Sequence, residues 1–291
     1  MYSYLKQTIL FTLIINFAFC SLAGAQSIHK TVHSKSVNKK NAYNFIHYFP
    51  DTSLAILVAE RLHKKVEDIV SIKELARIKG NFEVGPGSVS NLKGIGYLTG
   101  INSFGCYKNE VTEIPAEIGK LTNLVSLDLC KAFSLEKVPP EIGNLNKLKW
   151  IRLCLTQVKV IPKEIGNLNQ LEYLDISCNR LRNIPAEIGN LKSLKRLYIE
   201  SNILKKVPDE ICNLTSLTSL DMSYCMLIQL PDSIGNLRSL RFLNLFKNDL
   251  RVLPPSIKMM DILSTLNVFD NFNLSESYKM YLPKLLKKKK R

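Results

Sequence analysis

The chain has 291 residues, 46% of them hydrophobic, which is enough to bury a sizeable core and excludes a wholly disordered protein. Its formal net charge is +15, but one lysine in 1–25, four in 26–48 and six basic residues in 284–291 leave only +4 for the rest. A body so nearly balanced excludes the broad basic surface of a specific nucleic-acid-binding protein.

Residues 1–25 have the three parts of a secretory signal. Lys6 precedes an apolar run at 9–20, and small residues follow. The pattern predicts cleavage before Gln26 and a secreted, periplasmic or cell-surface protein with no transmembrane span in the mature chain. An uncleaved anchor is disfavoured because the run is shorter than the roughly 20 residues that span a bilayer. Lipoprotein processing at Cys20 is disfavoured by the bulky rings just before it.

Two segments precede the repetitive part of the chain. Residues 26–48 are rich in Ser, Asn, Lys and His, and are expected to form a basic, disordered linker. Residues 49–91 are expected to form a helical N-terminal cap. Asp51 can cap a first helix, whose apolar face holds Leu54, Leu57, Val58 and Leu62. Ser71 and Glu74 have the spacing of a capping box for a second helix, which stops near Gly80.

An internal repeat organises residues 92–274. Prolines recur at 115, 139, 162, 185, 208, 231 and 254, at one interval of 24 residues and then five of 23. The phrase Ile-Pro-Ala-Glu-Ile-Gly-Asn-Leu, with small variations, surrounds most of them. Between the prolines lies L-x-x-L-x-L-x-x-N-x-L, for example at Leu171, Leu174, Ile176, Asn179 and Leu181.

This pattern resembles the leucine-rich repeats, specifically the 23-residue class found in Ras-scaffold and plant resistance-type proteins. The stretches at 49–54 and 92–98 are similar to the N-terminal cap and first repeat of the internalins and related bacterial surface proteins. The resemblance implies an α/β fold, a right-handed solenoid (horseshoe) of about eight repeats with a parallel concave β-sheet. The periodicity agrees, because L-x-L makes one strand face apolar and stacking buries it.

Three repeats depart from the pattern at or beside the asparagine. One residue is inserted between Leu129 and Leu135, Thr156 replaces the asparagine of one repeat, and Cys225 replaces that of another. Local irregularity is expected there, without loss of the fold. Residues 275–291 are expected to form a C-terminal cap and a polybasic tail.

The strand positions between the leucines are expected to face the concave side, where a partner would be read. Aromatic and arginine side chains are enriched at interfaces because they bury large areas and can pair or stack. The candidate partner-binding residues are Tyr107, Asp128, Trp150, Arg152, Tyr173, Asp175, Arg196, Tyr198, Glu200, Asp221, Phe242, Asn244, Phe246 and Phe269. The alternative is an ordinary surface whose aromatic side chains pack on one another.

Six cysteines remain after the predicted cleavage, and none forms a Cys-x-x-Cys pair, which argues against a zinc or redox site. Cys130 and Cys154 occupy equivalent positions on adjacent repeats. They are expected to be either a disulfide in an oxidising compartment or a pair of free thiols.

An enzymatic function is not expected. All four histidines precede the repeats, so no Ser-His-Asp or Cys-His arrangement can form on the strands. No phosphate-binding motif is present, and the pairs at Gly94/Gly96 and Gly85/Gly87 are turn glycines. No cofactor or metal is predicted.

The sequence therefore predicts an exported, non-catalytic module that binds a protein through its concave face. One alternative is a cell-surface adhesin or envelope component that contacts an anionic surface through its C-terminal Lys/Arg tail. A second is a carbohydrate-binding solenoid, in which Trp150 and Tyr173 form the stacking platform.

Overall fold

The computed structural model describes residues 42–87 and 89–275. The predicted signal at 1–25, most of the predicted linker at 26–48 and nearly all of the predicted C-terminal cap and tail lie outside these residues. No helix within the described part of the chain is long and apolar enough to cross a membrane.

The described chain begins with a small strand pair and three helices. β1 (Ala42–Asn44) pairs antiparallel with β2 (Ile69–Ser71). The helices are α2 (Phe45–Tyr48), α3 (Thr52–Arg61) and α4 (Ile72–Leu75). β1 and α2 lie in the range that was expected to be a disordered linker. Composition did not indicate them, because β1 pairs with β2, which lies far along the chain.

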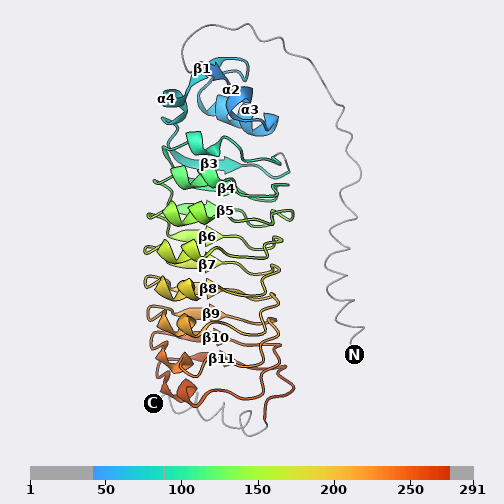
Figure 1. Ribbon diagram of the computed structural model, residues 1–291, viewed down its shortest axis with the longest axis vertical. Helices are drawn as coiled ribbons and strands as arrows, with labels where there is room; N and C mark the ends of the chain where they lie inside the picture. Colours follow the sequence, from blue (N-terminus) through green and yellow to red (C-terminus); the bar gives the residue numbers. More distant parts are fainter. Residues whose placement is uncertain (1–41, 88, 276–291) are drawn as a thin grey trace, which may run out of the picture. The chain divides into compact units, whose positions relative to one another are not determined.

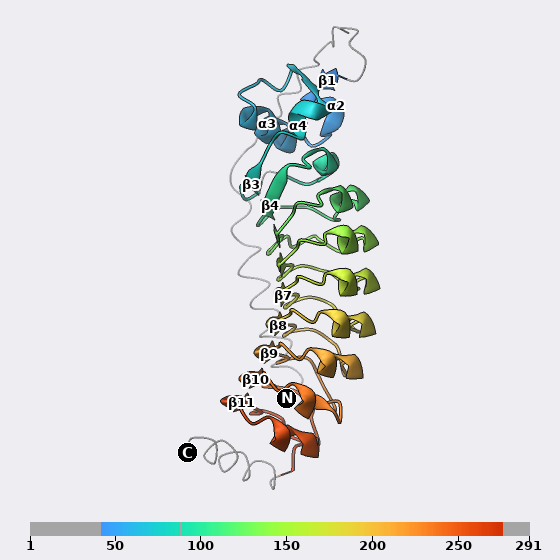
Figure 2. The ribbon, with the colours of Figure 1, turned by 90° about the vertical axis from the view of Figure 1, so that its left-hand side faces the viewer.

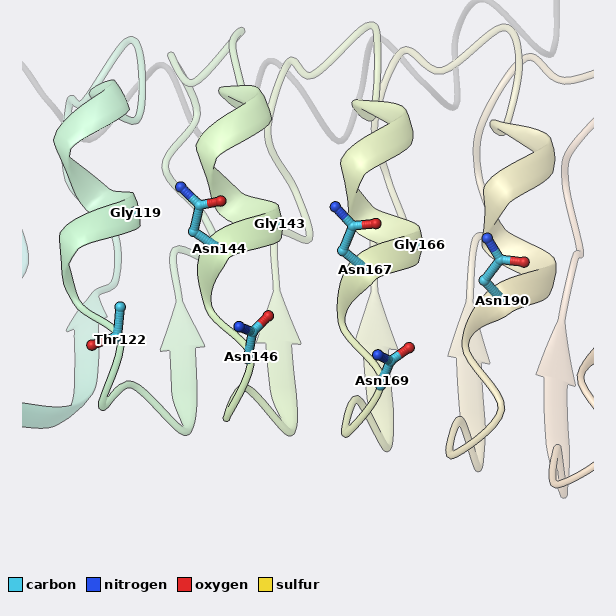
Figure 3. Close-up of a pocket in the computed structure, with 9 residues that line it drawn as sticks. All are labelled: Gly119, Thr122, Gly143, Asn144, Asn146, Gly166, Asn167, Asn169 and Asn190. Carbon is cyan, nitrogen blue, oxygen red and sulfur yellow. The ribbon is translucent and has the colours of Figure 1, made fainter.

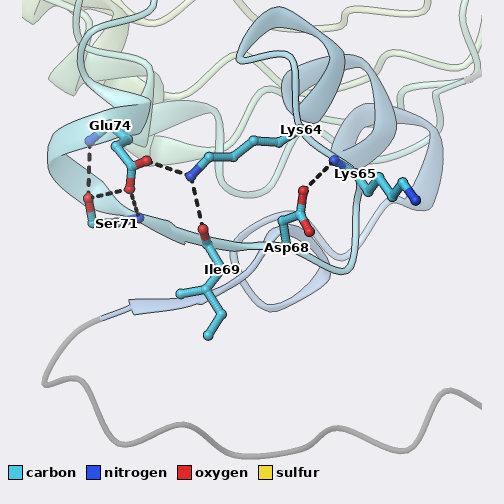
Figure 4. A network of polar contacts seen from close by, with 6 residues as sticks. All are labelled: Lys64, Lys65, Asp68, Ile69, Ser71 and Glu74. Carbon is cyan, nitrogen blue, oxygen red and sulfur yellow. Dashed lines mark hydrogen bonds and ion pairs between the residues drawn. The ribbon is translucent and has the colours of Figure 1, made fainter.

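Both predicted helix caps are present. The Asp51 side chain accepts a hydrogen bond from the backbone N–H of Leu54 at 3.1 Å. Ser71 and Glu74 form a reciprocal capping box at the start of α4. Lys64 adds a third contact, because its Nζ lies 2.5 Å from Glu74 Oε1 and donates to the Ile69 carbonyl (Figure 4). The Lys64 hydrogen bond is the main reason why the pKa of Glu74 falls to about 2.

The repeats build one parallel sheet of nine strands in chain order, each paired with the next (Figure 1). The strands are β3 (Gly80–Val84), β4 (Ile101–Cys106), β5 (Ser126–Asp128), β6 (Trp150–Arg152), β7 (Tyr173–Asp175), β8 (Arg196–Tyr198), β9 (Ser219–Asp221), β10 (Phe242–Asn244) and β11 (Thr265–Asn267). This confirms the predicted leucine-rich-repeat solenoid. β4 to β11 belong to the eight predicted repeats, whereas β3 lies within the range assigned to the cap.

A row of short 3₁₀ helices lies opposite the sheet, and the apolar core fills the space between them (Figure 2). They are η1 (Ile95–Tyr97), η2 (Ala116–Lys120), η3 (Pro140–Asn144), η4 (Lys163–Asn167), η5 (Ala186–Asn190), η6 (Asp209–Asn213), η7 (Ile234–Asn236) and η8 (Pro255–Met259). The first leucine or isoleucine of each L-x-L phrase is the central residue of its strand and points inward. Ile151, Leu174, Leu197 and Leu220 are fully buried.

A buried asparagine joins neighbouring repeats after each regular strand. The Asn179 amide donates to the carbonyls of Ile176 in its own repeat, at 3.1 Å, and of Leu153 in the preceding repeat, at 2.7 Å. Its Oδ1 accepts from the backbone N–H of Val158 at 3.1 Å. Asn202, Asn248 and Asn271 repeat these contacts. One side chain thus satisfies backbone groups that would otherwise be buried without partners.

Two of the three predicted departures, Thr156 and Cys225, keep part of this network. The single hydrogen of the Thr156 hydroxyl is shared between the Leu153 carbonyl, 3.3 Å away, and Asn179 Oδ1. The Cys225 thiol donates to the carbonyl of Ile199 at 3.1 Å. Burial raises the pKa of Cys225 to about 12, so it keeps the proton that this bond requires. Thr and Cys replace the asparagine because each still supplies a donor.

The glycine in each Ile-Gly-Asn phrase is required by the close stacking of the 3₁₀ helices. A Cβ atom on Gly166 would lie 2.5 Å from the carbonyl oxygen of Glu187 in the next repeat. Cys212 occupies the equivalent position of η6, and there the next repeat carries Ser233 in place of the glutamate. The serine does not by itself explain the cysteine, because a Cβ atom on Gly235, which faces Ser256, would still lie 2.1 Å from the serine's carbonyl oxygen.

We expect Gly166→Ala to destabilise the protein by about 1 to 3 kcal/mol, because the new methyl group would overlap backbone that cannot move independently of the stack. Urea unfolding followed by circular dichroism measures the change. Gly85→Ala is the matched control, since a Cβ atom there has nothing within 4 Å. Equal stability of the two variants would contradict the steric explanation.

Candidate functional site

The outward side chains of the sheet form three columns, which together we call the sheet face. Strand register places the residue before each central leucine in column one and the residue after it in column two. Column three lies two residues further on, where each carbonyl accepts a backbone hydrogen bond from the preceding repeat. From β6 to β10, column one is Trp150, Tyr173, Arg196, Ser219, Phe242; column two is Arg152, Asp175, Tyr198, Asp221, Asn244; column three is Cys154, Ser177, Glu200, Ser223, Phe246.

Three aromatic rings form a continuous track across β6, β7 and β8. The rings of Trp150 and Tyr173 stack with their centroids 4.9 Å apart at an interplanar angle of 25°. Tyr173 also contacts Tyr198, at 5.5 Å. Trp150 remains 42% exposed, because the neighbouring column-one residue on β5 is Ser126. The track therefore offers large apolar area that the fold leaves open to a partner.

Ion pairs hold the charged residues at one side of this track. Arg152 Nη1 lies 2.8 Å from Asp128 Oδ2 on the adjacent strand. Just before β7, Glu172 lies between two lysines, 2.6 Å from Lys195 and 4.0 Å from Lys149. These pairs are partly exposed, so they contribute little to stability, but they fix the direction of the side chains that border the track.

Carboxylates occupy the centre of the sheet face. Asp175 is 8% exposed and accepts hydrogen bonds from the backbone and hydroxyl of Ser177 at 3.1 and 2.6 Å. Asp221 has the same relation to Ser223, at 2.9 and 2.7 Å. Glu200 lies between them on β8's repeat. Burial, and then the charges of Asp221 and Asp175, raise its pKa to about 7.

The far end of the sheet face is more apolar. Phe246 contacts Tyr224 edge-to-face at 5.4 Å, and the Lys247 ammonium lies 5.3 Å from the Tyr224 ring. Phe269 is 75% exposed. Tyr224 was not predicted, because it lies outside the L-x-L window, at the turn residue before the asparagine position. Residues at this turn have positive φ, 54° for Tyr224, which directs the side chain to the edge of the sheet.

The near end of the sheet face holds Tyr107 and a disulfide. Lys131 Nζ lies 3.2 Å from the Tyr107 hydroxyl, and this hydrogen bond lowers the pKa of Tyr107. Cys130 and Cys154, for which the sequence allowed either a disulfide or free thiols, are disulfide-bonded across adjacent repeats. Their Cα atoms lie 4.6 Å apart. The bond covers column three beside the track and fixes β5 to β6.

The structure therefore brings most of the predicted residues together. Trp150, Tyr173 and Tyr198 lie in contact, and Asp175, Glu200 and Asp221 lie beside them on consecutive repeats. Tyr107 and Phe269 lie at opposite ends of the sheet. His47 and His63 belong to the N-terminal elements, away from the sheet face. In the part of the chain that the structure describes, no cluster of His, Cys, Asp or Glu could hold a metal ion.

A second surface, on the flank between the 3₁₀ helices and the sheet, is a shallow polar groove of about 790 Å³. Two rows of side chains line it, Asn144, Asn167 and Asn190 on the helices and Thr122, Asn146 and Asn169 below them (Figure 3). The glycines that also line the groove are those required by helix stacking. The groove is therefore a by-product of the repeat, and sequence reasoning did not single it out.

Comparisons with known proteins agree with this geometry. A family model described as a leucine-rich repeat region matches residues 140–226, and a second leucine-rich-repeat model matches 216–237. These matches identify residues 140–237 as leucine-rich repeats. No curated protein matches its sequence significantly.

Solved leucine-rich-repeat structures resemble the chain at low sequence identity. A leucine-rich-repeat protein of Leptospira interrogans is 28% identical, with a TM-score of 0.64 over 75% of this chain and 61% of its own. The ectodomain of the Arabidopsis thaliana receptor kinase GASSHO1/SCHENGEN3, in complex with CASPARIAN STRIP INTEGRITY FACTOR 2, is 26% identical, with a TM-score of 0.61 over 69% of this chain and 26% of its own. Internalin C2 of Listeria monocytogenes shares the fold at 21% identity and a TM-score of 0.51, over 72% of this chain and 100% of its own.

This chain thus spans about three fifths of the Leptospira protein and a quarter of the plant ectodomain. Leucine-rich repeats are typically non-catalytic protein-interaction modules, and the solved neighbours include a complex with a protein ligand. At this level the comparisons support the predicted class of function, a protein-binding repeat module.

The raised pKa of Glu200 makes a prediction about stability. Since its folded pKa, about 7, lies above its ordinary value of 4.5, the charged form is disfavoured in the folded state. The unfolding free energy should therefore rise by roughly 2 kcal/mol between about pH 8 and pH 5, at about 1.4 kcal/mol per pKa unit reduced for partial exposure. Urea unfolding of wild type and Glu200→Gln at each pH isolates this group. An unchanged difference between the two proteins across this range would contradict the assignment.

Proposed function

We propose that this leucine-rich-repeat protein binds a protein partner through the sheet face and catalyses no reaction itself. The observation that supports this is the continuous track of Trp150, Tyr173 and Tyr198, bordered by the Arg152–Asp128 pair. Large aromatic side chains with charged groups around them are the usual centres of protein interfaces.

The scaffold favours binding because the track is already ordered. Its three strands are held by parallel backbone pairing on both sides, and the central leucines are fully buried. The rings also restrict one another by stacking. A partner would therefore lose little entropy in ordering this side of the interface, so more of the contact energy remains as affinity.

We further propose that the protein is exported. The signal-like segment at 1–25 supports this, and so does the Cys130–Cys154 disulfide, since disulfides persist in oxidising compartments and are rare in the cytosol. The support comes from two unrelated features of the chain.

Loss of the track should abolish partner capture. In pull-downs from the source organism's culture, we expect proteins retained by wild type to be lost with Trp150→Ala/Tyr173→Ala. Phe133→Ala is the matched control, because Phe133 is 48% exposed in the turn after β5, outside the sheet face. Proteins retained equally by all three would contradict the proposal. Glycan-array binding that depends on Trp150, with protein capture unaffected, would instead favour the carbohydrate-binding alternative.

Export makes a separate prediction about the native protein. Protein recovered from source cells should begin at Gln26 and should carry the Cys130–Cys154 bond, which intact-mass spectrometry shows as a gain of about 2 Da on reduction. The expected fractions are the medium, the periplasm or the cell surface. A cytosolic protein with an intact signal segment and free thiols at both positions would refute export while leaving the binding proposal untouched.

A further inference from the structure

The centre of the sheet face carries three carboxylates on three consecutive repeats. Asp175 and Asp221 lie in column two on β7 and β9, separated only by Tyr198, and Glu200 lies beside them in column three. None of the three forms an ion pair with any residue in 42–87 or 89–275. Arg152 lies in register with Asp175 on β6 but forms its ion pair with Asp128 instead, so the repulsion between the three neighbouring like charges costs stability.

The fold does not need these charges. The second-column side chain of each repeat accepts a hydrogen bond from the backbone N–H two residues later, at 3.1 Å for Asp175 and 2.9 Å for Asp221. Asn244 and Asn267 make the same bond on β10 and β11, both at 3.2 Å. A neutral asparagine thus performs the structural task equally well. The aspartates also accept from the hydroxyls of Ser177 and Ser223, and Asp221 Oδ2 accepts from Asn244 Nδ2 at 2.8 Å, but the shared backbone bond does not require their charge.

Glu200 adds a second departure from the repeat. The equivalent positions on both neighbouring repeats are serines, Ser177 and Ser223, which bond to the aspartates. In contrast, Glu200 Oε2 is buried without a hydrogen-bond partner among the described residues. The carboxylate receives hydrogen bonds from Ser177 and from its own backbone, but an oxygen that has lost water and gained no donor is costly. If the side chain turned outward to meet a donor brought by a ligand, that cost would be removed.

The surroundings restrict what the donor can be. Tyr198 lies between the two aspartates in column two, and Tyr173 contacts Tyr198, so aromatic faces border the carboxylates. Arg196 lies in column one of the same strand and is exposed, and the half-buried thiol of Cys178 and the buried thiol of Cys225 lie near Glu200. Carboxylates beside aromatic rings match a guanidinium or ammonium group, and the exposed Arg196 in column one favours placing that group over columns two and three.

We propose that the protein partner places a basic side chain, arginine or lysine, against Asp175, Glu200 and Asp221 in the centre of the sheet face. This rests on the proposed function and specifies its partner as a basic polypeptide segment. Charge complementarity supports this assignment, because the middle of the sheet face is acidic although the whole chain carries a formal charge of +15. The positive net charge excludes a general electrostatic attraction to basic proteins. Binding therefore depends on short-range contact between the cation and the three carboxylates.

Ionisation of Glu200 sets the pH dependence of this contact. Because burial and the two aspartates raise its pKa to about 7, Glu200 is half protonated near neutral pH. The bound cation favours the ionised form, so affinity rises as pH increases through this range. Glu200→Gln removes this dependence.

The test uses the full chain and a fluorescein-labelled hexa-arginine peptide, followed by fluorescence anisotropy, with hexa-citrulline as the uncharged isostere. We expect Asp175→Asn/Glu200→Gln/Asp221→Asn to weaken hexa-arginine binding by about tenfold or more, as for other close charge pairs. The matched control is Glu141→Gln/Glu164→Gln/Glu187→Gln on the 3₁₀ side, which changes the net charge equally and should alter affinity less than about twofold. Thermal unfolding verifies that both variants fold.

Three results would overturn the inference: equal weakening by the two triple variants, tight binding of hexa-citrulline, or no binding of hexa-arginine. Competition from the basic segment 284–291 of the same chain is tested by deleting it in wild type and in the sheet-face triple variant. A gain in hexa-arginine affinity confined to wild type would assign the site to that segment instead of a partner. If hexa-arginine fails while the Trp150/Tyr173 variant still loses partner capture, only the basic-side-chain assignment falls.

Discussion

Neighbouring repeats of this protein are joined where the chain leaves the sheet. Backbone N–H and carbonyl groups are buried there and need hydrogen-bond partners. In the regular repeats a buried asparagine supplies them, bonding within its own repeat and to the preceding one, and Thr156 and Cys225 supply part of this network where they replace it. Without such a donor, several backbone carbonyls would be desolvated at once, which costs more than any single apolar contact provides. Strand register, the spacing of the 3₁₀ helices and the direction of the outward side chains all follow from this connection.

The stack also separates structural from functional positions. Inward residues are restricted to leucine, isoleucine and a few substitutes, and the helix-side glycine is restricted by the carbonyl of the next repeat. The outward positions of the sheet are not restricted by packing in this way, so tryptophan, arginine, tyrosine and aspartate can all occupy them. Side chains on the sheet face therefore differ from repeat to repeat, whereas the core hardly changes.

Much of the fold could be predicted from the sequence because leucine, asparagine, proline and glycine recur at a spacing that few other folds require. The leucine spacing indicated the strands, and the Ser71/Glu74 pattern indicated α4. β1 and β3 could not be predicted, since neither carries the repeat pattern and each is defined by a partner elsewhere in the chain. For the sheet face, spacing indicated which residues point outward. It could not show the disulfide, the stacking of Trp150 on Tyr173 or the burial of Glu200, which depend on side-chain direction across repeats.

The extra residue after β5 shows where this architecture accepts change in length. The insertion falls in the turn around Phe133 and Ser134, yet β5 and β6 keep the same pairing register as every regular pair, with Leu127 opposite Ile151. The turn is closed by backbone hydrogen bonds from Ala132 to Leu129 and from Leu135 to Ala132, so the additional residue is absorbed before the next proline. Loops could therefore lengthen at this turn in any repeat, so that a lineage of such proteins could acquire new recognition elements there without rebuilding the scaffold.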